Sequence, residues 1–167
     1  MSETEKFLAA TMPRLTEAEI AIHNGDAGPR IEMWSRNEPV TLFGAAVTRT
    51  GWAEARRTFE WLGSSFSDCT GYEIEVVAAG ASGDLAYLVA FEHTTASVNG
   101  APPESYTLRV TTVFRREDGE WRVAHRHGDS LKSRAGFRLA AQLQASDRQV
   151  PVPSPSPGGR GEETGTE

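Results

Sequence analysis

The chain has 167 residues, with 17 Lys and Arg against 23 Asp and Glu, a net charge of −6 and one cysteine, Cys69. A lone cysteine excludes a disulfide framework within the chain, and an acidic chain without basic runs argues against binding to nucleic acid or anionic membranes. No apolar run approaches the roughly 18 residues of a membrane helix and no signal peptide is visible, so we expect a cytoplasmic protein.

The first part of the chain is predicted to be helical. Residues 3–24 place their apolar side chains on one side of a helix, and Pro13 either lies in a first turn or kinks a longer helix. Gly25 is predicted to end this helix in a left-handed conformation. Asp26 is the expected N-cap of a short second helix that runs to about residue 34.

A third helix follows a short predicted strand at residues 40–43. Thr50 is its expected N-cap. The apolar residues that recur at helical spacing are Trp52, Ala55, Phe59, Leu62 and Phe66. Such a stripe has to lie on another apolar surface, and a sheet is the natural partner.

The second half is rich in Val, Thr, Tyr and Phe, which is typical of strands. Four strands are predicted, at residues 72–77, 85–95, 105–115 and 120–127. Each connection is too short for a helical crossover, so neighbouring strands should be antiparallel. Strands near ten residues long normally twist and curl.

The end of the chain changes in composition near residue 146. A short helix is expected at residues 133–143, and residues 146–167 are rich in Pro and Gly with almost no large apolar side chains. Such a segment cannot bury enough surface to offset its ordering entropy. We therefore expect one domain at residues 1–145 and a disordered tail at residues 146–167.

These elements predict an α+β fold. Its expected form is a cone-shaped, curved antiparallel sheet with about three N-terminal helices covering the concave face. A curled sheet covered on one side encloses a tapered cavity, which is where a small ligand would bind.

The chain resembles the nuclear transport factor 2-like superfamily over about residues 5–131. The most recognisable stretch is residues 108–129, where the hairpin Asp118-Gly119-Glu120-Trp121 followed by His125 and His127 is similar to the closing hairpin of the calcium/calmodulin-dependent kinase II association domain. The supporting pieces are Asn24-Gly25-Asp26, residues 41–44, Gly51-Trp52 and residues 83–87. The resemblance implies the fold, with SnoaL-like cyclases and ketosteroid isomerases as relatives, and makes a homodimer the expected assembly.

One known mechanism does not carry over with the resemblance. Ketosteroid isomerases place a general-base carboxylate near the first strand and an acidic hydrogen-bond donor on a later strand. The corresponding stretches here, residues 40–43 and 110–113, contain no carboxylate. Proton abstraction beside a carbonyl needs a base within hydrogen-bond reach, so any isomerase-like or cyclase-like activity would have to use other residues.

The resemblance implies which side chains line the cavity. The cavity-facing set that corresponds to the ketosteroid isomerases is Arg109, Thr111, Val113, Ala124, Arg126 and Gly128. On that assignment Glu92 lies between Arg109 and Arg126, where it would act as general acid or base while the arginines hold anionic groups of a substrate. The alternative is a salt-bridge ladder on the surface of the sheet.

Further candidates are weighed against plain packing. Trp34 and Trp61 are candidate cavity walls and Thr41 a candidate polar contact, although aromatic residues on helices more often belong to the core. His125 and His127 share a strand face at a spacing that can also present imidazoles to a metal, but packing produces the same spacing. No metal and no cofactor are expected.

The predicted function is that of a SnoaL-like protein that binds a small molecule in a conical pocket. The candidate reactions are those of a cyclase, isomerase or lyase on a small organic, anionic substrate, with Glu92 as catalytic residue. Its predicted substrate contacts are Arg109, Arg126, Thr111, Trp34 and Thr41. The alternative is a non-catalytic module for oligomerisation or ligand sensing.

Overall fold

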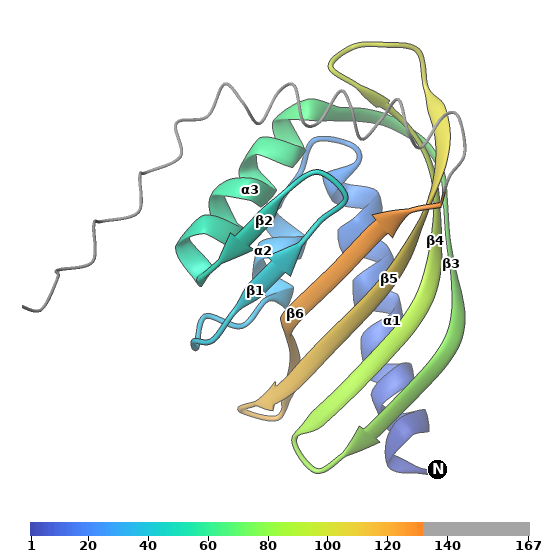
Figure 1. Cartoon of the computed structure of the whole chain (residues 1–167). Coiled ribbons are helices and arrows are strands. Elements are labelled where there is room, and N and C mark those ends of the chain that lie inside the picture. Colours follow the sequence, from blue (N-terminus) through green and yellow to red (C-terminus); the bar gives the residue numbers. More distant parts are fainter. Residues whose placement is uncertain (132–167) are drawn as a thin grey trace, which may run out of the picture.

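A computed structural model describes residues 1–131, so the expected helix at 133–143 and the expected tail at 146–167 lie outside the described residues. Within the described part, the helices are α1 (Glu3–Ile22), α2 (Gly28–Met33) and α3 (Trp52–Ser65). They pack on one face of a curved sheet that does not close into a barrel (Figure 1). The predicted α+β class is confirmed. None of the helices at residues 1–131 is long and apolar enough to cross a membrane.

The sheet has six strands in the order β2-β1-β6-β5-β4-β3. The strands are β1 (Thr41–Phe43), β2 (Thr48–Thr50), β3 (Phe66–Ser82), β4 (Leu85–Val98), β5 (Glu104–Glu117) and β6 (Glu120–Ser130). β3 to β6 form the predicted antiparallel meander. β1 pairs with β6 in parallel, so the sheet is mixed at this end. The short strand β2, which pairs with β1, was not predicted.

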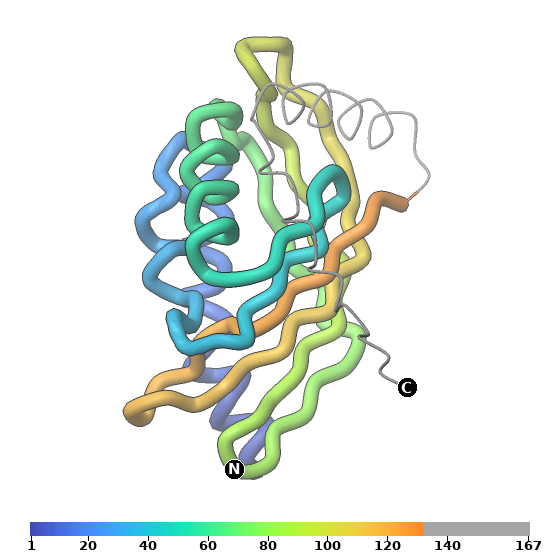
Figure 2. Tube along the Cα trace, turned by 60° about the vertical axis from the view of Figure 1, so that its left-hand side comes forward, coloured from blue at the N-terminus to red at the C-terminus, as the bar shows by residue number. Residues whose placement is uncertain are grey.

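The meander strands are longer than predicted and they bend. β3 extends over 17 residues, and its pairing with β4 shifts register twice, between Ser67 and Gly71 and between Val76 and Ala78. Such bulges increase local twist and bend a strand. The sheet therefore curves around the helices, and its other face carries no helix of the described part (Figure 2).

Helix α1 is continuous and contains Pro13 in its interior. It begins with a capping box, because the Ser2 side chain accepts from the backbone N–H of Glu5 while the Glu5 side chain accepts from the backbone N–H of Ser2. Gly25 follows with a φ of 96°, which confirms the predicted left-handed stop. The N-cap of α2 is Ala27, one residue later than predicted, although the Asp26 carboxylate does accept from the Gly28 N–H.

Helix α3 is held by the loop before β1 rather than by its predicted cap. Its N-cap is Gly51, which has no side chain, and the Glu38 carboxylate accepts from the backbone N–H of Trp52 at 2.7 Å. Thr50 is the last residue of β2, so its prediction as N-cap is wrong. Phe66, predicted as the last member of the helical stripe, begins β3 instead.

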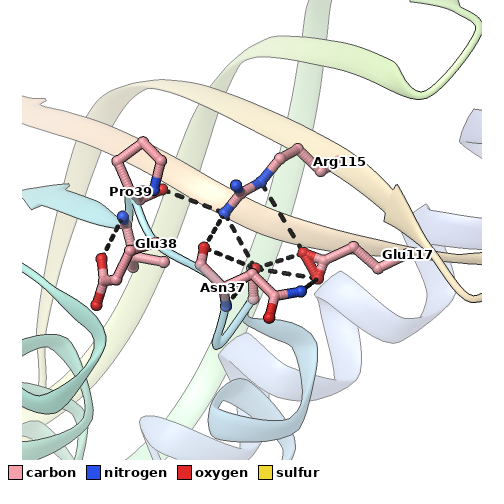
Figure 3. Close-up of polar contacts among 7 residues, drawn as sticks. Asn37, Glu38, Pro39, Arg115 and Glu117 are labelled. Atoms are coloured by element: carbon pink, nitrogen blue, oxygen red, sulfur yellow. Dashed lines mark hydrogen bonds and ion pairs between the residues drawn. The ribbon is translucent and has the colours of Figure 1, made fainter.

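The loop that carries Glu38 is fixed to the end of β5 (Figure 3). The Glu38–Pro39 peptide bond is cis. Arg115 donates to the backbone carbonyls of Asn37 and Pro39, and Glu117 accepts from the Asn37 side chain at 3.1 Å. Because this loop also caps α3, β5 indirectly positions that helix over the sheet.

The two ends of the space between helices and sheet differ in filling. Near the start of α1, the ring of Phe7 makes edge contacts with Phe114 at 5.1 Å and with Trp121 at 5.2 Å between ring centroids. All three side chains are buried, so this end is a packed aromatic core. The other end, around the end of α1, is hollow and contains the candidate site.

Candidate functional site

A cavity of about 80 Å³ lies between the helices and the concave face of the sheet. Its wall is mostly apolar, and the large apolar side chains that line it are Ile22, Leu42, Val47, Trp61, Leu62, Phe66 and Leu108. A single water molecule needs about 10–15 Å³ by this measure of volume, so the space can hold a group larger than one water. The polar lining is gathered in one cluster of charged and hydrogen-bonding side chains, which comes from α1, α2 and β4–β6.

Glu92 and Arg126 form a buried ion pair in this cluster. Two guanidinium nitrogens of Arg126 donate to the two carboxylate oxygens of Glu92, at 2.8 and 2.6 Å. The Glu92 side chain is only 3% exposed and the Arg126 side chain 9%. A bidentate pair is the geometry in which burial of two charges is best compensated. The predicted convergence of these two residues is therefore observed.

A second buried pair lies beside the first. Arg30 of α2 donates to the carboxylate of Glu19 on α1 in a short contact. Burial alone would raise the pKa of Glu19, but the charges of Arg30 and Arg126 outweigh it, so this pKa is lowered. Burial would lower the pKa of Arg126, but the carboxylates of Glu92 and Glu19 raise it. The four side chains thus carry two positive and two negative charges, which cancel.

His23 and Tyr106 complete the polar cluster. The Nδ1 atom of His23 lies 2.6 Å from the backbone carbonyl of Glu19, and its Nε2 atom lies 2.5 Å from the hydroxyl of Tyr106. Since a carbonyl only accepts, Nδ1 carries the proton of the neutral ring, and Nε2 accepts from the Tyr106 hydroxyl. Burial lowers the pKa of His23, with partial opposition from the Glu19 carboxylate. The ring is therefore neutral near pH 7.

Tyr72 places another hydroxyl in the interior. Its Oη atom is buried and has no hydrogen-bond partner among residues 1–131. Burial and the neighbouring carboxylates of Glu92 and Glu19 raise its pKa, so the phenol stays protonated. A buried polar atom without a partner is costly, so this hydroxyl is available to a water, although Tyr72 is not among the residues that line the cavity.

The structure corrects the predicted orientation of β5. Arg109 lies on the outer face of the sheet, more than half exposed, and donates to Asp129 at 3.0 and 2.7 Å. Thr111 is exposed on the same face. The reason is register: Arg126 lies opposite Thr112 rather than Thr111, so the interior side chains of β5 are those with even numbers. Neither Arg109 nor Thr111 reaches the cavity.

Two other predicted contacts also lie outside the cavity. Trp34 is buried in the core, with its ring 4.8 Å from that of Phe59. Thr41 pairs with His125 of β6, and its hydroxyl is hydrogen-bonded to Nδ1 of that histidine at 2.7 Å. Its side chain therefore lies on the outer face of the sheet, whereas the next residue, Leu42, points into the interior. Trp61, by contrast, lines the cavity as predicted.

The outer histidines, His125 and His127, contact the ring of Phe43. Both imidazole rings are in edge contact with the Phe43 ring, at 5.4 Å for His125 and 5.7 Å for His127 between centroids. No group of three or more His, Cys, Asp or Glu side chains with metal-binding geometry occurs in the described part of the chain. Cys69 is partly buried, and burial raises its pKa, which disfavours a reactive thiolate.

Sequence reasoning missed Glu19, His23 and Arg30 as interior groups. A signal was present for the first two. The buried residues Phe7, Thr11 and Leu15 recur every four positions along α1, and Glu19 and His23 continue that spacing. A charged or titratable residue on the buried stripe of a helix has to find a partner in the interior.

Comparison with known proteins agrees with this architecture. Residues 14–130 match the sequence model of the SnoaL-like domain. None of the curated proteins matches the sequence.

Several solved structures share the fold. A candidate dehydratase of the nuclear transport factor 2-like family from Streptomyces avermitilis has a TM-score of 0.62 and 16% identity, over 77% of this chain and 99% of that one. A superfamily protein from Salmonella enterica has a TM-score of 0.60 and 13% identity, over 78% and 92%. A candidate ketosteroid isomerase from Parabacteroides distasonis has a TM-score of 0.56 and 17% identity, over 74% and 88%. At these identities the likeness shows the fold alone.

Proposed function

Because the chain belongs to the SnoaL-like domain family of the nuclear transport factor 2-like superfamily, we propose that it binds a small, uncharged and mostly apolar organic molecule in its interior cavity. The observation that carries this proposal is the pairing of charges in the polar cluster. Arg126 and Arg30 already bind Glu92 and Glu19, so neither guanidinium is left to neutralise an anionic ligand. We therefore favour a neutral ligand over the anionic one expected from the sequence.

Acid–base chemistry of the isomerase, cyclase or dehydratase kind is the catalytic part of this proposal. Support comes from the names of two structural neighbours, a candidate dehydratase and a candidate ketosteroid isomerase. Within the cavity, Glu92 accepts a hydrogen bond from Arg126 at each carboxylate oxygen. Protonation of Glu92 would break this pair, so we assign Glu92 and Arg126 to the fixed polar end of the site rather than to proton transfer.

A homodimer formed through the outer face of the sheet is a second part of the proposal. In one row across this face, Tyr87 lies opposite Val113, which lies opposite His125. In the next row, Val89, Thr111 and His127 follow in the same way, next to Phe43. Tyr87 is 46% exposed and Phe43 37% exposed. Exposed aromatic and aliphatic side chains on one continuous face are typical of a protein interface.

The ligand proposal is tested with two molecules of the same shape and different charge. 2-Naphthol is neutral near pH 7 and 2-naphthoate is an anion. A ligand that binds the folded state raises the melting temperature, so 2-naphthol should raise it and quench tryptophan fluorescence through Trp61, whereas 2-naphthoate should do neither. Equal effects of the two compounds would refute the neutral-ligand proposal.

A matched pair of variants locates the binding. Leu62→Arg places a charge in the apolar wall and should abolish the response to 2-naphthol. Leu85→Arg makes the same change at a residue that is 59% exposed at the start of β4, and the response should persist. If no neutral aromatic compound binds the wild type, the alternative of a non-catalytic oligomerisation module is favoured.

A further inference from the structure

We propose that a second site, on the outer face of the sheet, binds a small organic cation that carries a primary amine. The site is a hollow of about 410 Å³, a volume within the range of about 300–1,000 Å³ that is usual for ligand pockets. It lies on the opposite face of the sheet from the interior cavity. This inference therefore goes beyond the proposed binding function and does not depend on it.

Three strands form the hollow, close to the turn between β4 and β5 (Figure 1). Two rows of paired residues run across it from β3 to β5, namely Glu73, His93 and Thr107, and then Gly71, Thr95 and Ser105. Side chains alternate along a strand, and Glu92 points into the interior, so its neighbour His93 and both rows lie on the outer face. Gly71 has no side chain, which leaves the surface low at this point.

A hydrogen-bonded chain along the first row leaves an acceptor facing the hollow. Nε2 of His93 lies 3.2 Å from the Glu75 carboxylate, and its Nδ1 lies 2.8 Å from the Thr107 hydroxyl. Since a carboxylate accepts, Nε2 carries the proton of the neutral ring, and Nδ1 accepts from Thr107. The Thr107 oxygen then has no proton left to donate, but it can still accept.

The second row adds a pair of hydroxyls. The side-chain oxygens of Thr95 and Ser105 lie 2.7 Å apart, so one hydroxyl donates to the other. One proton therefore remains to the two groups, together with several acceptor positions. Acceptors outnumber donors in the hollow, which favours a ligand that mainly donates.

The charge of the hollow selects among such ligands. The Glu73 carboxylate is exposed and forms no hydrogen bond or ion pair within residues 1–131. Among the same residues, no Lys or Arg lines the hollow. Arg109 of the neighbouring row already donates to Asp129. An anion would be repelled here, whereas a primary ammonium group carries three donors, a positive charge and no acceptor.

Three probes with the same four-carbon chain separate the ligand classes. Putrescine ends in two ammonium groups, 1,4-butanediol in two hydroxyls and succinate in two carboxylates. In NMR titrations of the full chain, putrescine should shift the backbone amide signals of Gly71, Thr95 and Ser105 saturably, whereas the other two probes should not. Equal binding of putrescine and 1,4-butanediol would overturn the preference for an amine. Absence of saturable shifts with putrescine would overturn the site itself.

A matched pair of variants separates binding in the hollow from attraction by the net charge of −6. Glu73→Gln and Glu17→Gln remove the same charge, from the hollow and from an exposed position on α1. Glu73→Gln should raise the Kd of putrescine by about threefold or more, the scale of an exposed ion pair, whereas Glu17→Gln should leave it nearly unchanged. Equal weakening in the two variants would overturn the inference.

A third variant tests the hydroxyls without a change in charge. Thr95→Val keeps the branched shape of the side chain and removes one hydroxyl of the pair with Ser105. The Kd of putrescine should rise by about threefold, the scale of one hydrogen bond. Wild-type affinity in both Glu73→Gln and Thr95→Val would place putrescine elsewhere on the protein and would overturn the inference.

Discussion

Glu38 caps helix α3 from outside the helix, because its carboxylate accepts from the backbone N–H of Trp52 at 2.7 Å. The other oxygen of this carboxylate accepts from the Val40 N–H at 2.8 Å. One side chain therefore joins the loop before β1 to the helix that carries the cavity residues Trp61 and Leu62.

Glu38→Ala should lower the free energy of unfolding by about 0.5–2 kcal/mol, the range for loss of a helix cap. The matched control is Glu60→Ala in the same helix. Glu60 forms an exposed pair with Arg56 at 3.1 Å, and such pairs contribute about 0.3–0.5 kcal/mol. Urea unfolding measures both. Equal losses in the two variants would contradict the capping role.

The Glu92–Arg126 pair predicts a non-additive effect on stability. Arg126→Met alone leaves the Glu92 carboxylate buried without its partner and should cost about 3–5 kcal/mol of unfolding free energy. The double variant Glu92→Leu, Arg126→Met removes both charges, so much of that loss should be recovered. Urea unfolding of the single and double variants gives the coupling free energy between Glu92 and Arg126.

Arg109→Met is the control for this experiment. Its exposed pair with Asp129 on the outer face should contribute only about 0–1 kcal/mol. If Arg126→Met costs no more than Arg109→Met, the buried pair does not stabilise the interior in the way the geometry indicates.

The lowered pKa of His23 predicts how stability depends on pH. Because burial lowers this pKa in the folded state, the unfolded chain takes up a proton first as the pH falls below about 6.5. The stability from neutral His23 is complete above that pH and is lost as the pH falls through the folded-state pKa. His23→Gln should therefore have a flatter dependence of unfolding free energy on pH below 6.5 than the wild type.

Two other groups, His125 and Glu19, also make the unfolding free energy fall as the pH falls. Their contributions can be separated from that of His23. The pKa of His125 is lowered by burial and by His127, so His125→Gln should remove a smaller part of the same slope. The lowered pKa of Glu19 acts below about pH 4.5, the ordinary value of its carboxyl. An unchanged slope between pH 6.5 and 5 in His23→Gln would contradict the buried neutral ring.

The fold was predictable from the sequence because it depends on periodicity and turn chemistry, which act locally. The apolar stripe of Trp52, Ala55, Phe59 and Leu62 correctly predicted α3, and the short connections correctly predicted the antiparallel meander. The strand β2 was missed, since three residues without alternating apolar side chains give no strand signal.

The site was only partly predictable because it depends on register between strands. The predicted contact between Glu92 and Arg126 is observed. The prediction was wrong in placing Arg109 and Thr111 of β5 on the same side of the sheet as Arg126 of β6. The pairing of β5 with β6 shifts between Val113 and Phe114, so Val123 and Ala124 are both buried and the alternation along β6 changes at that point. A bulge of this kind adds one residue to one strand, and alternation read along a single strand does not show it.

The exposed side chains on the outer face of the sheet lead to a prediction about the proposed homodimer. Val113 lies in the middle of that face, between Tyr87 on β4 and His125 on β6. In the proposed homodimer, Val113→Arg would place two like charges in the interface, one from each protomer, and desolvate both. We expect size-exclusion chromatography with light scattering to give the mass of a dimer for the wild type and of a monomer for Val113→Arg.

Ile20→Arg on α1, where Ile20 is 39% exposed, is the control and should stay dimeric. A wild type that is monomeric at high concentration, or a Val113→Arg variant that remains dimeric, would contradict an interface on this face.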